Sequence, residues 1–308
     1  MALTIEQLLT IKAAADCGSF SAAARKLGKA QSTVSATINN LEQETGVVLF
    51  DRSGRYPTLT EAGQGIVEHI ATLLAQVDNL EGKFNASAVG IESELTLVVD
   101  AAIPYDFLAP TLNKFYQEFP YVTLHVEHPN LDATLNGLVS EHYVLALMLT
   151  QPNYPDELKF HRLGNLKMAE VAQAEHPLCQ IQPVTFADLS SYRQIIFSPH
   201  GRNLVTAEYL RSSMRLYIDN YATLIQMTLD GLGWSVVPES MVAPLLEKGE
   251  LVELLLESYP HTKWEVGIDL VWSRRAHLGL AAQWLQRDLS SRSANTSKTM
   301  VSGHKALR

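Results

Sequence analysis

The sequence has few cysteines, no long apolar run and no export signal. Cys17 and Cys179 are its only 2 cysteines, too few for a disulfide framework and typical of a chain whose thiols stay reduced. No uninterrupted apolar stretch approaches the roughly 18 residues that a membrane span requires. The first residues are polar and lack a basic region, so we expect no signal peptide. These absences predict a cytoplasmic protein without a membrane partner.

The sequence also lacks the motifs of common enzyme classes. It contains no G-x-S-x-G nucleophile elbow, no Walker A loop and no H-E-x-x-H zinc motif. Gly231 and Gly233 follow a predicted helix and precede a predicted strand, which is the reverse of a dinucleotide-binding loop. His125 and His128 have no set of ligands beside them, so surface histidines explain them better than a metal site. We therefore expect no enzyme activity, no metal and no cofactor.

Acidic side chains outnumber basic ones, but unevenly along the chain. There are 33 Asp and Glu against 24 Lys and Arg, a formal net charge of −9. That excess alone would argue against nucleic acid as a partner. Residues 1–60, however, carry nearly balanced charge, so the excess of acid lies after residue 60. The distribution is compatible with a DNA-binding head on an acidic body.

The start of the chain predicts three short helices. A capping box of Thr4 and Gln7 opens the first. Ser21 is expected to cap the second helix, which Gly28 ends, and the third covers about residues 30–44. Two short helices joined by a turn that contains glycine are typical of a helix-turn-helix.

The third predicted helix has one apolar and one neutral polar side. Val34, Ile38 and Leu41 form its buried stripe, and no charged residue lies between positions 30 and 41. A small, neutral, hydrogen-bonding face suits close approach to base edges in a major groove, although a solvated helix face is the alternative. The candidate DNA-reading residues are Gln31, Ser32, Thr33, Ser35 and Ala36.

A wing and a long helix are predicted next. Two short strands, 47–50 and 56–59, flank a turn in which Arg52 and Arg55 suit phosphates or a minor groove. The helix that follows Thr60 repeats apolar residues at alternating intervals of four and three, which predicts a dimerisation seam; burial against a neighbouring domain is the alternative. The seam consists of Ile66, Ile70, Leu73, Val77, Leu80 and Phe84.

From Leu95 to Leu289 predicted strands alternate with helices, which indicates mostly parallel sheets. The length suits two lobes, between which ligands bind at the carboxyl ends of strands. Two alanines and an isoleucine on one wall favour a partly apolar or aromatic metabolite. The candidate effector-binding residues are Ala101, Ala102, Ile103, Thr150 and Gln151 in one lobe, and Ser198, His200, Asn220 and Pro238 in the other.

Several segments together resemble the LysR-type transcriptional regulators. They are the run Gly18-Ser19-Phe20-Ser21-Ala22-Ala23-Ala24-Arg25-Lys26-Leu27, the residues from Gln31 to Ser35, Leu49-Phe50-Asp51-Arg52, Leu59-Thr60-Glu61-Ala62-Gly63, Phe119-Pro120-Tyr121-Val122, and the stretch from Gly231 to Pro238. The resemblance implies an α/β multidomain fold: a winged helix-turn-helix (1–60), a linker and dimerisation helix with a hinge (61–92), and a two-lobed periplasmic-binding-protein-like effector domain (93–289). Its lobes would be 93–164 with 269–289, and 165–268, followed by a disordered tail (290–308).

The resemblance also implies a function. A protein of this kind binds double-stranded promoter DNA as a homodimer or homotetramer and responds to a small molecule in the cleft between the lobes. RNA polymerase is a further candidate partner. Two alternatives stay open: a redox-responsive regulator that uses Cys179, which would need a thiol of low pKa, and a solute-binding protein without DNA function.

Overall fold

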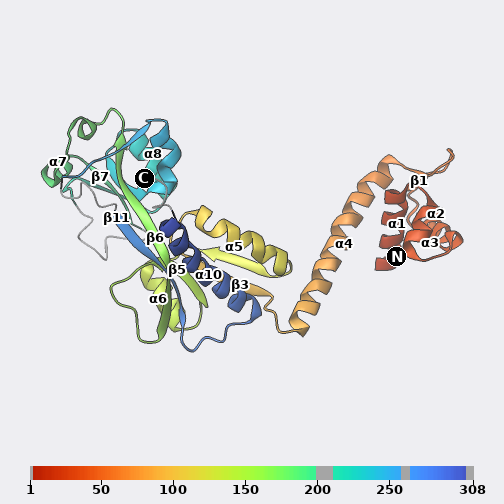
Figure 1. The fold of residues 1–308 in the computed structure, drawn as a ribbon. Helices are drawn as coiled ribbons and strands as arrows, with labels where there is room; N and C mark the ends of the chain where they lie inside the picture. The colour runs from red at the N-terminus through yellow and green to blue at the C-terminus, as the bar shows by residue number, and fades with distance from the viewer. Residues whose placement is uncertain (1–2, 199–210, 258–263, 303–308) are drawn as a thin grey trace. The chain divides into compact units, whose positions relative to one another are not determined.

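A computed structural model describes residues 3–198, 211–257 and 264–302 (Figure 1). The predicted effector residue His200 lies outside them. The chain divides into two compact units, Met1–Val89 and Gly90–Arg308.

Four helices and a small two-stranded wing form the described part of the first unit (Figure 1). The capping box of Thr4 and Gln7 is present, and Gly18 ends the first helix in the left-handed conformation. The predicted cap of the second helix is wrong by two residues: the hydroxyl of Ser19, not Ser21, accepts the Ala22 N–H at 3.2 Å. The earlier start makes Phe20 part of the helix and buries its ring. The elements are α1 (Ile5–Cys17), α2 (Phe20–Leu27), α3 (Gln31–Thr45), β1 (Phe50–Asp51), β2 (Thr58–Leu59) and α4 (Glu61–Ala88).

One apolar core holds this unit together. The predicted stripe of α3 is buried in it, with Val34 and Ile38 fully covered. The α4 helix adds Val67 and Ile70 to the same core, so its first turns belong to the head. The wing strands are shorter than predicted, pairing only Phe50 with Leu59 and Asp51 with Thr58.

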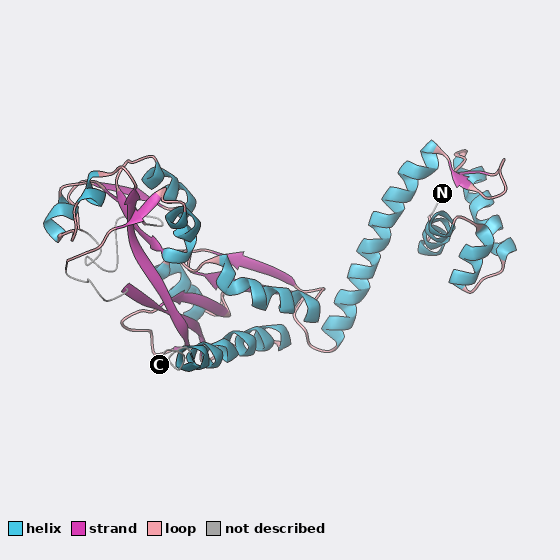
Figure 2. Ribbon diagram, turned by 45° about the horizontal axis from the view of Figure 1, so that its top comes forward, coloured by secondary structure: helices cyan, strands magenta, loops and turns pink. Residues whose placement is uncertain are grey.

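A nine-stranded sheet forms the frame of the second unit, in the order β4-β3-β5-β11-β6-β9-β7-β8 with β10 beside β6. Figure 2 shows its strands in magenta. The strands are β3 (Glu94–Val99), β4 (Thr123–Glu127), β5 (Leu145–Leu149), β6 (Leu158–Gln173), β7 (Gln194–Phe197), β8 (Arg215–Ile218), β9 (Trp234–Pro238), β10 (Leu251–Glu253) and β11 (Trp264–Ser273). The helices are α5 (Tyr105–Glu118), α6 (Leu131–Val139), α7 (Phe186–Ser190), α8 (Tyr221–Leu229), α9 (Glu239–Glu247) and α10 (Leu280–Ser302), with a 3₁₀ turn, η1 (Pro177–Gln180).

Two long strands connect two lobes. The parallel set β3, β4 and β5 forms one lobe, and the parallel set β7, β8 and β9 forms the other. The antiparallel pair β6 and β11 runs through both, and its register shifts between Ile268 and Asp269. Gly164 faces Ile268 and Arg162 faces Asp269, so one residue of β6 bulges there. The shift coincides with the lobe boundary expected near 164/165 and 268/269.

The C-terminal segment differs from its prediction. A disordered tail is expected over 290–308; α10 continues to Ser302, and residues 303–308 lie outside the described residues. Its first turns are anchored because the Glu92 carboxylate accepts the N–H groups of Ala281 and Ala282 at 2.9 and 3.2 Å. Such capping satisfies N–H groups of the first turn, which would otherwise lack partners.

Candidate nucleic-acid interface and ligand cleft

The outer side of α3 is neutral and open to solvent at its N-terminal end. Gln31, Ser32, Thr33 and Ala36 are exposed, and Ser35 is half-buried. The helix is held from behind by the buried Val34 and Ile38, so these polar groups stand on a rigid element. The assignment of these residues to DNA reading stays a prediction.

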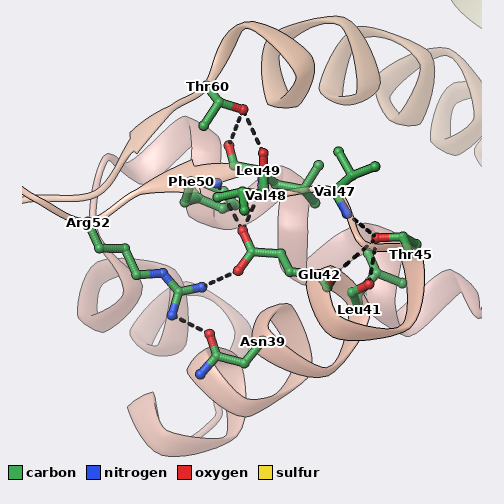
Figure 3. Close-up of polar contacts among 10 residues, drawn as sticks. All are labelled: Asn39, Leu41, Glu42, Thr45, Val47, Val48, Leu49, Phe50, Arg52 and Thr60. Carbon is green, nitrogen blue, oxygen red and sulfur yellow. Dashed lines mark hydrogen bonds and ion pairs between the residues drawn. The ribbon is translucent and has the colours of Figure 1, made fainter.

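The Arg52 side chain is engaged inside the head (Figure 3). Its Nη2 donates to Glu42 Oε2 at 2.6 Å, its Nη1 donates to the Asn39 side chain, and its guanidinium lies 5.2 Å from the centre of the Phe20 ring. The predicted role of Arg52 in binding phosphate stays a prediction, and the structure adds a second role for it within the head. Arg52 connects the wing to α3 because its guanidinium donates to Glu42 and Asn39, which are both residues of α3.

Glu42 is the centre of this network and was missed from sequence (Figure 3). Besides Arg52, it accepts the backbone N–H groups of Leu49 and Phe50 at 2.7 and 3.0 Å. A carboxylate with three donors fixes the start of the wing against α3. One signal was available: Glu42 follows Ile38 by four residues, which places a lone acid next to the buried stripe of the helix.

Arg55 is the second arginine of the wing, and its contact with DNA stays a prediction. Its guanidinium lies 5.5 Å from the Tyr56 ring centre, and it forms no ion pair within residues 3–198, 211–257 and 264–302.

We predict that Arg55→Ala lowers the slope of log K against log salt by about one per protomer, because one phosphate contact is lost. Arg52→Ala should instead lower the melting temperature of the head. Fluorescence anisotropy at several salt concentrations and thermal unfolding of both variants separate the two roles; an unchanged salt slope for Arg55→Ala would contradict this assignment.

The predicted seam of α4 is exposed except near the head. Ile70 is only 4% exposed because it packs in the head core with Val67. Its assignment to the dimerisation seam is therefore wrong. Further along, Leu73, Leu80 and Phe84 are 53%, 54% and 68% exposed. Ile66 is also exposed and Val77 is half-buried.

The loop after β3 does not form an apolar wall. Ala102 and Ile103 are 1% and 5% exposed and belong to the core of their lobe, while Ala101 is half-buried. The N–H groups of Ala102 and Ile103 donate to the Asp100 side chain and carbonyl, both at 2.9 Å, which turns this loop inward. Ala102 and Ile103 are thus not available as effector ligands. They therefore give no support to an apolar metabolite.

The end of β5 lies in the same lobe and has one unsatisfied group. The Thr150 N–H donates to the Gly267 carbonyl at 2.8 Å, but its Oγ1 is buried and has no hydrogen-bond partner among the described residues. The Gln151 amide donates to the Leu149 carbonyl at 2.8 Å. The Thr150 hydroxyl therefore keeps its hydrogen-bonding capacity free, whereas the Gln151 side chain is held locally.

In the second lobe, the predicted residues serve mainly the fold. The Ser198 N–H donates to Ile218 at 2.7 Å, and Asn220 caps α8 by accepting the Thr223 N–H at 3.0 Å. Pro238 is buried opposite Met168 in the ladder of β9 and β6. Asn220 and Pro238 thus have structural roles, and their assignment to the effector site stays a prediction.

Sequence reasoning missed Asp100, the first residue after β3. Burial raises the pKa of its carboxyl, while the backbone N–H groups of Ala102 and Leu149 and the nearby His128 act in the opposite direction. The available signal was a carboxylate directly after a buried strand. The three residues that follow it, 101–103, are apolar and favoured a different prediction.

An ion pair between a buried carboxylate and a half-exposed guanidinium lies at the register shift of the two connecting strands. Asp269 is fully buried and accepts from Arg162 and, at 2.8 Å, from the Tyr154 hydroxyl. Burial and this carboxylate raise the pKa of Tyr154. Since Asp269 and Arg162 belong to the two strands that connect the lobes, the pair fixes their register at the bulge.

Cys179 is poorly suited to redox chemistry. Burial raises the pKa of its thiol, and Sγ donates to the Gln173 carbonyl at 3.4 Å. A raised pKa reduces the thiolate fraction that oxidation requires, which weakens the redox alternative.

Within the described ranges no cluster of three or more His, Cys, Asp or Glu side chains could hold a metal ion. The same ranges contain no helix long and apolar enough to cross a membrane.

Comparisons with known proteins agree on both units. Residues 5–64 match the family described as bacterial regulatory helix-turn-helix protein, lysR family, and residues 89–293 match the LysR substrate binding domain. The chain is 33% identical over 288 residues to the transcriptional regulator AceR of Acinetobacter baumannii, covering 92% of this chain and 96% of that protein. It is 29% identical over 296 residues to YhaJ of Escherichia coli K12, a probable transcriptional regulator, covering 94% and 96%.

Solved structures share the fold. CrgA from Neisseria meningitidis, a LysR-type regulator, aligns with a TM-score of 0.54 at 21% identity over 96% of this chain and 100% of that one. Full-length CbnR complexed with its target DNA aligns with a TM-score of 0.50 at 20% identity over 95% and 100%. The match to the helix-turn-helix model favours a regulator over a solute-binding protein, and this family consists of regulators rather than enzymes. The chain therefore belongs to the LysR family of DNA-binding transcriptional regulators.

Proposed function

We propose that two copies of this chain bind a partly palindromic promoter site, each with the N-terminal part of α3 in a major groove. The observation that carries the proposal is the exposed, neutral face of Gln31, Ser32 and Thr33 on a helix whose other side is fully buried. Gln31 suits a bidentate contact to adenine, and Ser32 or Thr33 suits a phosphate or a thymine methyl group. Arg55 adds a contact from the wing.

Dimerisation follows from the small area of DNA that one head can contact. One short helix contacts too few base pairs for a specific site, so two heads on a twofold axis are needed. The exposed part of α4 supplies the pairing surface, through Leu73, Leu80 and Phe84. Pairs could join further into tetramers through the second unit, and contact with RNA polymerase at the promoter would complete the regulatory function. Chromosomal DNA as the target places the protein in the cytoplasm.

The second unit is proposed to bind a small effector between its lobes. The carboxyl ends of β3 and β5 lie at the same edge of the sheet, where ligands of open α/β folds bind. The β6 and β11 strands connect the lobes, so a ligand that contacts both would shift the equilibrium between their arrangements. Gel-shift selection from genomic fragments, with and without extracts of small metabolites, tests both halves of the function.

Gln31→Ala should change which base is preferred at one operator position. Loss of a bidentate contact costs about 1–3 kcal/mol at the matching base pair and little at the others. A library of operator variants titrated with wild type and Gln31→Ala measures this. Gln43→Ala, on the same helix but beyond its N-terminal turns, is the matched control because Gln43 is also exposed. Equal base preference in all three proteins would show that Gln31 does not read the sequence.

A further inference from the structure

Asn39 lies on the exposed side of α3 and is held by an arginine of the wing (Figure 3). It follows Ser35 by four residues and Ala36 by three, so it lies one turn further along the side that carries the candidate DNA-reading residues. Its side-chain oxygen accepts from Nη1 of Arg52, while Nη2 of the same guanidinium donates to Glu42 at 2.6 Å. The wing and α3 therefore meet at the Asn39 amide.

The contact with Arg52 decides which end of the Asn39 amide is left for a partner. A guanidinium has donors and no acceptor, so it can hold only the amide oxygen, Oδ1. The amide nitrogen, Nδ2, points away from Arg52 and Glu42 in Figure 3. It forms no hydrogen bond to the described residues, and it is not one of their buried polar atoms that lack a partner. The two N–H donors of Asn39 are thus open to solvent.

A single acceptor suits this amide better than the edge of a base. Asparagine recognises adenine through its oxygen and its nitrogen together, and Arg52 already occupies the oxygen of Asn39. A cation that donates to Oδ1 also polarises the amide, which makes its N–H groups stronger donors. An anionic acceptor gains most from such donors, and the phosphate oxygens beside a groove are the anionic acceptors of DNA.

We propose that Asn39 donates from Nδ2 to a phosphate oxygen of the promoter DNA, and that Arg52 is the positioning residue that orients its amide. The contact fixes the register of α3 on the duplex and does not read sequence. Because the donor is neutral, it adds affinity without adding to the salt dependence of binding. The inference rests on the proposed placement of α3 in the major groove.

Asn39→Asp separates DNA binding from folding. Aspartate has the same size and still accepts from Arg52, but it replaces both N–H donors by an anionic oxygen. Its melting temperature should therefore stay close to that of wild type, while its affinity for the operator falls. A purely structural role of Asn39 predicts instead that this variant binds like wild type.

Two further variants calibrate the loss. Asn39→Ala removes the donors without adding charge and should weaken operator binding by about tenfold, the value of one hydrogen bond to a charged group. Asn39→Asp should lose more than this, because its carboxylate repels the phosphate. Gln43→Glu makes the same change from amide to carboxylate one turn further along α3, where the side chain is exposed. It is the matched control and should bind close to wild type, because salt screens its charge.

A double-mutant cycle tests the positioning role of Arg52. Asn39→Ala should cost less affinity in an Arg52→Ala background than in wild type, because the amide is no longer oriented there. Both affinities are measured by fluorescence anisotropy with full-length protein, below the melting temperature of Arg52→Ala. Equal costs in the two backgrounds would remove Arg52 from the proposal.

A library of operator variants, titrated at several salt concentrations, identifies the acceptor. Asn39→Ala should weaken every variant by the same factor and leave the salt slope unchanged. A changed preference at one base pair would show that the acceptor is a base and overturn the phosphate contact. Wild-type binding by Asn39→Asp, or by Asn39→Ala if the aspartate does not fold, would also overturn it, as would an equal loss in Gln43→Glu. Wild type that binds no operator would instead disprove the placement of α3, and this contact with it.

Discussion

Leu73→Glu should convert the protein from dimers to monomers and weaken specific DNA binding by at least about 100-fold, since two linked heads gain roughly that factor over one. Leu73 is 53% exposed on α4 and lies midway along the proposed seam. In a twofold pair its carboxylate would enter an apolar interface beside Val77 and Leu80, where loss of solvation is costly. Light scattering measures the mass, and gel shift with a full operator measures the affinity.

The matched control is Ala75→Glu. Ala75 is exposed on the same helix but lies two residues from Leu73, on the side away from the seam. It introduces the same charge and should leave both dimer and affinity unchanged. A Leu73→Glu protein that remains dimeric would move the pairing surface away from α4. Monomers from both variants would indicate that added charge, rather than its position, disrupts the assembly.

Local signals predicted the head well. Helix caps depend on residues close in sequence, so Thr4, Gly18 and Gly28 could be assigned from the chain alone. The heptad spacing of α4 was also visible, but spacing does not reveal which partner covers an apolar residue. Ile70 satisfies the repeat equally well whether it faces a second helix or its own head, and the packing of α1 against α4 decides for the head.

Residues whose roles depend on distant partners were assigned less well. Arg52 is an unremarkable wing arginine in sequence, and only the fold brings Glu42 and Asn39 to it. The loop after β3 reads as three apolar residues facing a cleft, but hydrogen bonds to Asp100 turn Ala102 and Ile103 into the core. The position of the cleft at the strand ends follows from general topology, whereas the chemistry of its lining requires tertiary contacts.

Gly63→Ala should destabilise the head by about 3 kcal/mol, a typical cost when added volume meets atoms that cannot move. Gly63 lies in the first turn of α4, where a Cβ would come within 2.1 Å of the Leu49 carbonyl oxygen. That carbonyl is held in place because it accepts the Thr60 N–H at 3.0 Å, while the Thr60 hydroxyl donates to the Val48 carbonyl at 2.8 Å (Figure 3). The new methyl group must therefore push α4 away from the wing.

Gly65→Ala provides an internal control two residues further along the same helix. A Cβ at Gly65 meets nothing within 4 Å, so this change should stabilise the helix by about 0.5–1 kcal/mol through the better helix propensity of alanine. Urea unfolding of the full-length protein, followed by circular dichroism, measures both free energies. Because α4 positions the head relative to the seam, Gly63→Ala should also weaken operator binding, while Gly65→Ala should leave it intact. Equal stability of the two variants would mean that the wing does not pack against α4 at Leu49.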